Sequence, residues 1–304
     1  MAMVLVLAWA VGSCLGSFFN VAVWRIPRKQ SVVSPGSRCP GCGHAIPWYR
    51  NLPVLTWVLQ RGKCAWCGFR IPVFYVLVEA LCGGLAVVTV WLTTSGGWPV
   101  DLALGWGVFA LFAVPIALID WEHFEIPDGL VASAFAMGLF VRTFFAEVPA
   151  EGFVESIRSA MLAAGGLYAL HFFARVILGG WGNLVRSIRP KGIRWHWRRG
   201  WRGQCLQLVA RWSAFDGDME ALGLGDVTLG LAAGACLGAP AVLLGLAPAA
   251  FFGVGGYFWR QRHPRSAQMA LAAGVDPLAI PFGPFLAAGF LLSAWLLHGG
   301  SLGF

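Results

Sequence analysis

Two aspartates, Asp120 and Asp226, lie at the ends of long apolar runs in a chain that carries few charges. Asp120 belongs to the stretch ALIDWEHFEIPDGL, and Asp226 follows Gly223 and Gly225 in the stretch ALGLGDVTLG. Because glycines lack side chains, another helix or an extended peptide can approach Asp226 closely. Two carboxylates in a partly dry site share one proton, so that one activates water and the other protonates a scissile carbonyl. The pair predicts aspartic protease chemistry.

Each aspartate also has a purely structural interpretation. Asp120 could cap a helix boundary, and Asp226 could pair with a neighbouring base. The two acids together with the glycines favour a catalytic pair, since acids inside membranes are usually functional. An alternative from another class is a transporter that uses both aspartates as a proton or cation relay. A transporter predicts internal repeats between the two halves of the chain, and the sequence has none.

Four cysteines form two pairs, Cys39-x2-Cys42 and Cys64-x2-Cys67, separated by 21 residues. Two such pairs supply the four thiolates that structural zinc binds in a tetrahedron. A disulfide pair is the alternative. The surrounding loop is basic and therefore expected in the cytoplasm, where thiols stay reduced. The spacing predicts a structural zinc site.

The elements that position these residues are membrane helices. Hydrophobic residues make up 58% of the 304 residues and charged residues only 12%, against roughly 25% charged in soluble proteins. The apolar start of the chain has no Lys or Arg before Arg25, which favours a retained first helix over a signal peptide. We expect an all-α polytopic membrane protein with about eight transmembrane helices. Expected spans are 2–24, 73–94, 102–119, 129–146, 157–178, 222–239, 241–258 and 278–298.

The basic residues predict the topology. Of the 22 Lys and Arg residues, 19 fall in the segments 25–72, 186–211 and 260–265. Such clustering is typical of cytoplasmic loops. With eight spans it places Asp120 and Asp226 in the same leaflet and both termini outside the cytoplasm.

This topology gives a domain organisation of three parts. They are the first transmembrane helix (1–24), a cytoplasmic zinc-binding loop domain resembling a zinc ribbon (25–72), and a transmembrane peptidase domain (73–304) with a basic cytoplasmic insertion at 179–213.

The segment 186–204, RSIRPKGIRWHWRRGWRGQ, alternates basic residues with tryptophan. This composition suits nucleic acid, through charge and base stacking. It also suits the membrane interface, where Trp lies at headgroup depth and Arg meets anionic lipid. Since the segment adjoins membrane spans, we expect anionic lipid and no nucleic acid.

Taken together, the motifs resemble the bacterial type IV prepilin peptidases, a family of GxGD-type aspartic proteases of the inner membrane. The resemblance extends in order over nearly the whole chain. Its pieces are GSFFNVAVWRIPR (16–28), the two cysteine pairs with RGKC (61–64), VE (78–79), LIDWEHFEIPD (118–128), GLGD (223–226) and PFGPFLA (281–287).

The resemblance implies a function and assigns roles to residues. Members of the family cut the short basic leader from prepilins and pseudopilins on the cytoplasmic side. Many then methylate the new N-terminus with S-adenosylmethionine, although a peptidase without methyl transfer is an alternative for this chain. The implied catalytic residues are Asp120 and Asp226, supported by Gly223, Gly225 and Asp128. The implied zinc ligands are Cys39, Cys42, Cys64 and Cys67, and Gly62 is a candidate for methyl transfer.

Two features depart from the family pattern. Members commonly have Lys two residues after the aspartate of GxGD, where this chain has Thr228 after Val227. The missing cation affects the electrostatics of the aspartate pair and any contact with a substrate carboxylate. The insertion at 179–213 is also longer and more basic than in typical members.

Overall fold

The computed structural model describes residues 1–188, 223–262 and 280–299, and these residues form helices without any β-strand. All eight expected spans coincide with helices, so the prediction of an all-α membrane protein is confirmed. The elements are α1 (Ala2–Arg25), η1 (Trp48–Arg50), α2 (Leu55–Leu59), α3 (Val73–Thr94), α4 (Val100–His123), α5 (Asp128–Phe144), α6 (Pro149–Ile188), α8 (Leu224–Leu237), α9 (Ala239–Arg262) and α11 (Gly283–Gly299).

Four of these helices are long and apolar enough to cross a membrane: α1, α3, α4, and residues Ala239–Gly256 of α9. Two shorter apolar stretches, Leu224–Leu237 and Gly283–His298, complete the hydrophobic set. Many large apolar side chains on α1 and α3 point outward, such as Leu7 and Leu81, which are more than half exposed. Outward apolar side chains are expected where lipid rather than water surrounds a helix.

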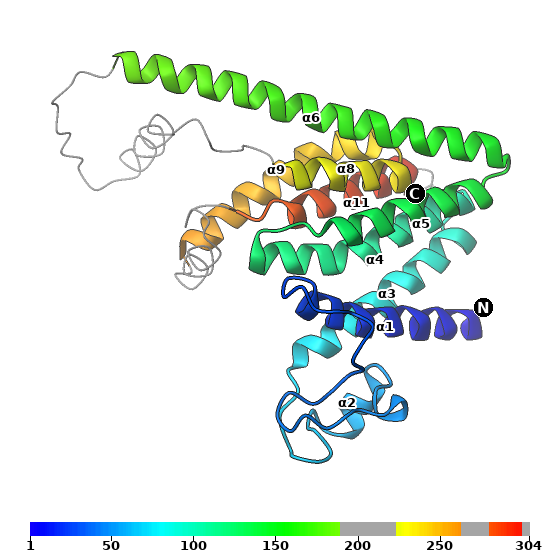
Figure 1. The fold of residues 1–304 in the computed structure, drawn as a ribbon. Helices are drawn as coiled ribbons and strands as arrows, with labels where there is room; N and C mark the ends of the chain where they lie inside the picture. The colour runs from blue at the N-terminus through cyan, green and yellow to red at the C-terminus, as the bar shows by residue number, and fades with distance from the viewer. Residues whose placement is uncertain (189–222, 263–279, 300–304) are drawn as a thin grey trace.

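Small residues let the helices pack closely. Gly12 and Gly16 of α1 pack directly against the backbone of α3 at Cys82 and Glu79. In the centre of the bundle, α8 touches α4, α5, α6, α9 and α11. Gly234 of α8 lies so close to α6 that a Cβ atom would be 2.6 Å from the carbonyl oxygen of Ser159. In Figure 1, α6 runs along one side of the bundle, opposite the α1 and α3 pair. Close packing through small residues is the usual solution for helices in lipid.

Several helices are longer than the hydropathy pattern predicted, α6 most of all. The helix α6 covers 40 residues, Pro149–Ile188, where the hydropathy pattern predicted only 157–178. At about 1.5 Å per residue it is roughly 60 Å long, and Figure 1 shows it extending past the bundle. The basic insertion predicted at 179–213 therefore begins as a continuation of a helix. Its remainder, 189–213, lies outside the described residues, and so does most of the predicted lipid-binding segment 186–204.

The helix α4 runs to His123 rather than ending at residue 119, as we expected. It ends because Phe124 adopts a left-handed conformation, with φ 58°, and donates its N–H to the Asp120 carbonyl. Pro127 then precedes the first residue of α5, Asp128. Asp120 is consequently a residue of the last helical turn, with its side chain directed by the helix, and not part of the following loop.

Candidate active site

Asp120 is buried, with 5% of its surface exposed. Its Oδ2 accepts a hydrogen bond from the backbone N–H of Gly283, over 2.9 Å. A carboxylate at a helix C-terminus faces the negative end of the helix dipole. Gly283 begins α11, and the first N–H groups of a helix have no partner within that helix. The start of α11 thus supplies the donor that Asp120 needs at the end of α4.

Asp226 is also buried, with 7% of its surface exposed, in the first turn of α8. Its Oδ2 accepts a hydrogen bond from the N–H of Gly223, over 3.0 Å, and its own N–H donates to the Gly223 carbonyl. A carboxylate in the first turn favourably faces the positive end of the helix dipole. The GLGD sequence therefore positions Asp226 locally.

The loop residue Ile126 joins the two halves of the site. A Cβ atom on Gly225 would lie 3.1 Å from the Cβ of Ile126, and one on Gly283 would lie 3.3 Å from its Cδ1. Both glycines therefore let the ends of α8 and α11 close on the same side chain. The carboxylates of Asp120 and Asp226 are close enough for their charges to repel. The structure brings together the two aspartates that the sequence singled out.

Among the described residues, each aspartate has one carboxylate oxygen that accepts a hydrogen bond and one that does not. Within the part of the chain that the structure describes, Oδ2 of Asp120 and of Asp226 accepts a backbone N–H, while Oδ1 accepts no hydrogen bond. No cation is paired with either carboxylate among the described residues. Two buried acids without a counter-ion hold a shared proton more readily than two charges. That state suits the activation of water between them.

The neighbouring predicted residues have different positions. Asp128 is exposed at the start of α5, where it is placed to stabilise the helix N-terminus. Thr228, which replaces the usual lysine of the family, donates its hydroxyl to the carbonyl of Gly225, over 2.8 Å. The Thr228 side chain is therefore turned back onto its own helix.

Sequence reasoning did not assign Gly283 or Ile126 to the site. The signal for Gly283 was present in the stretch PFGP, because a glycine between two prolines marks the start of a helix with an open backbone. Nothing in the sequence shows that this start lies against Asp120, which is 163 residues away. The contact depends on how α4 and α11 pack.

The four cysteines predicted to bind zinc meet at one point. Their Sγ atoms all lie within 4.8 Å of one another, and those of Cys39 and Cys67 are 3.8 Å apart. A tetrahedron with zinc–sulfur bonds of about 2.3 Å has sulfurs roughly 3.8 Å apart. The backbone N–H groups of Cys67 and Trp66 lower the pKa of Cys64 to about 6, which favours a thiolate there, whereas burial and the three other thiols raise the pKa of Cys67. The cluster fits a metal ion of the size and ligand preference of zinc.

The two cysteine pairs have the same backbone geometry. Gly43 donates its N–H to the carbonyl of Cys39 and Gly68 to that of Cys64, over 2.8 and 2.9 Å. Both glycines have φ of 70°, a left-handed conformation that favours glycine. The repeated turn points each pair of thiols toward the other, which explains why the spacing alone predicted the cluster.

Gly62, the methyl-transfer candidate, has φ of 67°, and a Cβ atom there would lie 2.8 Å from the Trp57 ring. Its packing therefore already requires glycine. Residues 25–72 contain no Asp or Glu, the side chains that typically hold a ribose hydroxyl. The surroundings of Gly62 do not by themselves make a site for S-adenosylmethionine, and we derive no methyl-transfer step from them.

Comparison with known proteins places this geometry in a family. The model of the bacterial peptidase A24 N-terminal domain matches residues 10–93, which include the cysteine cluster. The model of the type IV leader peptidase family matches residues 107–257, which include both aspartates. No solved structure matches the chain.

Three curated relatives carry the name prepilin leader peptidase/N-methyltransferase. The Myxococcus xanthus protein is 39% identical over 134 residues, 44% of this chain and 39% of the relative. The Dichelobacter nodosus protein is 27% identical over 69% of this chain and 80% of its own length. The Aeromonas salmonicida protein is 26% identical over 92% of this chain and 87% of its own length. With both family models matched in order and the two buried aspartates inside the second match, the chain belongs to the type IV leader peptidase family.

Proposed function

We propose that this protein is a membrane aspartic peptidase that cleaves the basic leader of type IV prepilins or pseudopilins on the cytoplasmic side of the inner membrane. The observation that carries the proposal is the pair of buried carboxylates, Asp120 and Asp226, held by backbone N–H groups and without a counter-ion among the described residues. Relatives that carry the name prepilin leader peptidase support the substrate class.

The chemistry follows from the pair. One aspartate, ionised, removes a proton from a water molecule between the two Oδ1 atoms, and the water oxygen attacks the scissile carbonyl. The other aspartate gives its proton to the carbonyl oxygen, so that a neutral tetrahedral diol forms. Collapse of the diol breaks the C–N bond as a proton passes to the leaving amine. Because the pair starts and ends with one shared proton, no further cofactor is consumed.

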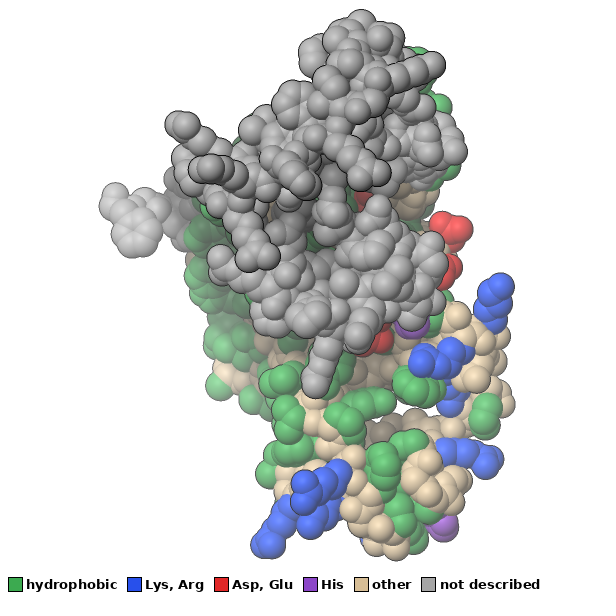
Figure 2. All heavy atoms as spheres, turned by 90° about the vertical axis from the view of Figure 1, so that its left-hand side faces the viewer, with side chains coloured by type: hydrophobic (Ala, Val, Ile, Leu, Met, Phe, Trp, Pro, Cys, Tyr) green, Lys and Arg blue, Asp and Glu red, His purple; other side chains and the backbone are tan. Residues whose placement is uncertain are grey.

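The apolar segment of the substrate would lie in the bilayer and its basic leader in the cytoplasm. Glu122 and Glu125 are exposed beside Asp120 and are placed to attract such a leader. In Figure 2, which looks at this end of the molecule, acidic side chains are visible above the basic loop.

Methyl transfer to the new N-terminus, with S-adenosylmethionine as donor, is the second part of the proposal. Its support is the N-methyltransferase name shared by the relatives. The four cysteines would hold structural zinc, whose role is to fold the loop domain rather than to activate a substrate.

The experiment combines the purified protein in lipid, a prepilin from the same cell and S-adenosylmethionine, with mass spectrometry of the product. We expect loss of a leader-sized peptide and gain of one methyl group. Asp120→Asn and Asp226→Asn should abolish cleavage, whereas Glu151→Gln, a change of an exposed acid at the start of α6, should not. Cleavage without the methyl group reduces the proposal to a peptidase. If the wild-type protein does not cleave the prepilin, the alternative function as an ion-coupled transporter is favoured instead.

A further inference from the structure

The loop between α1 and α3 carries charge of one sign. Residues 25–72 contain eight Lys or Arg residues, and the chain has no Asp or Glu before Glu79. Figure 2 shows this loop as the lower part of the molecule, with Lys, Arg and hydrophobic side chains on its surface. A surface of cations and apolar side chains, without acids, complements an anionic lipid surface.

The same loop exposes large apolar side chains within twelve residues. They are Trp48 (79% exposed), Tyr49 (54%), Leu52 (40%), Leu55 (54%), Val58 (58%) and Leu59 (72%). The segment 48–59 includes η1 and α2. A water-facing loop rarely gathers this much exposed apolar surface.

A buried hydrogen bond fixes how deep this segment lies. The N–H of Val54 donates to Oε2 of Glu79, over 2.7 Å, and Glu79 is buried on α3. Glu79 is six residues beyond the start of α3 at Val73, which is about 9 Å along the helix axis. The neighbouring helix α1 gives a similar depth for Glu79. Its residue Gly16 packs against the Cα of Glu79 and lies roughly 13 Å before the end of α1 at Arg25.

The segment 48–59 therefore lies beside the membrane helices and not beyond their ends. Val54 has φ of 59°, which is unfavourable for a β-branched residue. This position is held by the bond to Glu79, because a buried carboxylate that loses its donor becomes costly. Figure 1 shows α2 below α1 in the view, alongside it rather than past its end. On α3 itself Phe74 and Leu77 are also exposed, at 46% and 59%.

The inner side of α2 packs on the backbone that flanks the second cysteine pair. Trp57 donates its indole N–H to the carbonyl of Ile71, over 3.1 Å, and covers Gly62, whose N–H donates to the Trp57 carbonyl. The outer side of α2 presents Leu55, Val58 and Leu59. The helix is thus one-sided, with Trp57 packed on Gly62 and Ile71 and the opposite side chains exposed.

We propose that residues 48–59 form an interfacial segment that inserts into the headgroup region of the bilayer beside α1 and α3. The exposed cations Arg61 and Lys63 then meet anionic headgroups. The cysteine cluster is consequently fixed at the membrane surface. This inference does not depend on the peptidase activity, since it rests on depth, charge and exposure alone.

The first test is hydroxyl-radical oxidation of the full-length protein in nanodiscs of phosphatidylglycerol and phosphatidylcholine, read residue by residue by mass spectrometry. Trp66, in the second cysteine pair, is the internal control because it is the same residue type and 44% exposed, against 79% for Trp48. Insertion predicts that Trp48 is oxidised roughly tenfold more slowly than Trp66, in spite of its greater exposure. Faster oxidation of Trp48 than of Trp66 in the nanodisc would overturn the proposal.

The second test uses Leu59→Lys and the matched change Val33→Lys, at an 83% exposed residue of the same loop. The Lys at position 59 should raise the oxidation of Trp48 toward the rate of Trp66, and the Lys at position 33 should leave it unchanged. Nanodiscs of phosphatidylcholine alone should protect Trp48 less than mixed ones. Trp48 could be protected in native membranes but not in nanodiscs that hold this protein as their sole membrane protein. That result would show that a protein partner, and not lipid, covers the segment, and it would contradict the proposal.

Discussion

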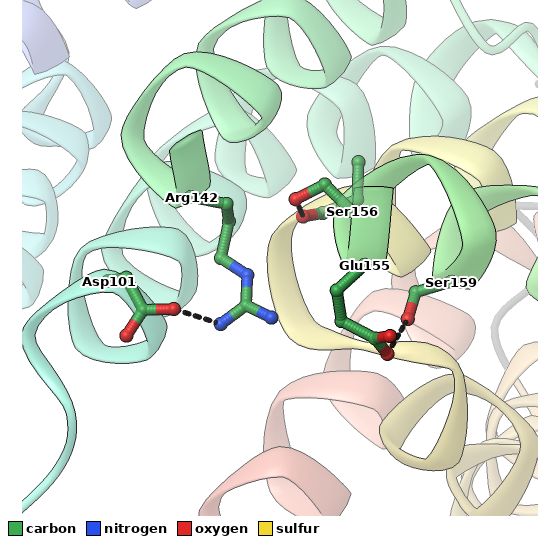
Figure 3. Close-up of polar contacts among 6 residues, drawn as sticks. Asp101, Arg142, Glu155, Ser156 and Ser159 are labelled. Carbon is green, nitrogen blue, oxygen red and sulfur yellow. Dashed lines mark hydrogen bonds and ion pairs between the residues drawn. The ribbon is translucent and has the colours of Figure 1, made fainter. Parts of the chain in front are cut away.

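Each end of α4 carries an aspartate, partly buried at Asp101 and buried at Asp120, and the two have opposite surroundings. Asp101 lies in the first turn of α4 and forms an ion pair with Arg142 at the end of α5, over 2.6 Å. Figure 3 shows the two side chains pointing toward one another. Asp120, about 28 Å further along the helix, faces another acid and, among the described residues, accepts a hydrogen bond from a backbone N–H alone.

The surroundings of the two aspartates indicate a structural role for Asp101 and a chemical role for Asp120. Asp101 sits at the favourable end of the helix dipole and has its charge compensated, so its environment stabilises the fold. Asp120 sits at the unfavourable end of the same helix, beside Asp226, without a cation among the described residues. An uncompensated buried acid costs stability, and proteins retain such groups where they work.

The largest expected effect is the loss of cleavage in Asp120→Asn or Asp226→Asn. Each change removes one half of the proton-sharing pair, so kcat/KM should fall at least about 10³-fold. The folded state should be no less stable, because each change also removes a buried acid that repels its neighbour. Cleavage assays and thermal unfolding of the same preparation check both parts. A variant that loses stability as well as activity would place Asp120 with Asp101 as a structural acid.

The next effect is on stability, at the other end of the helix. Arg142→Met leaves the partly buried Asp101 carboxylate without its partner and should lower the free energy of unfolding by about 3 kcal/mol. The double change Asp101→Asn with Arg142→Met should recover part of that loss. Thermal unfolding in one lipid or detergent measures both. The cleavage rate per folded molecule should stay within a few-fold of wild type. A loss of kcat without a loss of stability would show that the Asp101 end of α4 also contributes to the chemistry.

A smaller effect is expected for Gly283→Ala. The new Cβ would lie 2.8 Å from Oδ2 of Asp120, so the carboxylate must move by a fraction of an ångström. We expect kcat to fall about 10- to 100-fold with KM little changed. Gly129→Ala is the matched control, since a Cβ there meets nothing within 4 Å. If Gly283→Ala and Gly129→Ala have equal kinetics, the start of α11 is not part of the active site.

The smallest effect should come from Glu155→Gln, near the Asp101 pair. In Figure 3 Glu155 turns toward Ser159 and not toward Arg142. Its ion pair with Arg158 is exposed and three residues apart on one helix, so the change should cost roughly 0.5 kcal/mol or less. The same unfolding assay checks it. A loss as large as that of Arg142→Met would mean that Glu155 belongs to the buried ion pair.

Much of this arrangement was predictable from the sequence because it is local. The apolar runs predicted eight helices, since a span needs about 20 apolar residues whatever it packs against. The repeated Cys-x2-Cys-Gly turns predicted the metal cluster, because each turn points its own two thiols. GLGD predicted the position of Asp226, whose carboxylate bonds within four residues of chain.

Tertiary structure decided what lies between distant segments. Asp120 takes its donor from Gly283, and Gly283 shares Ile126 with Gly225, only because α4, α8 and α11 pack together. The partner of Asp101 was equally hidden, since no spacing rule links residues 101 and 142. The depth of the loop at Val54 came from one hydrogen bond to α3. Local patterns therefore determined which residues have side chains suited to chemistry. Helix packing determined which acid is paired with a cation, as Asp101 is with Arg142, and which acids have no cation beside them among the described residues, as with Asp120 and Asp226.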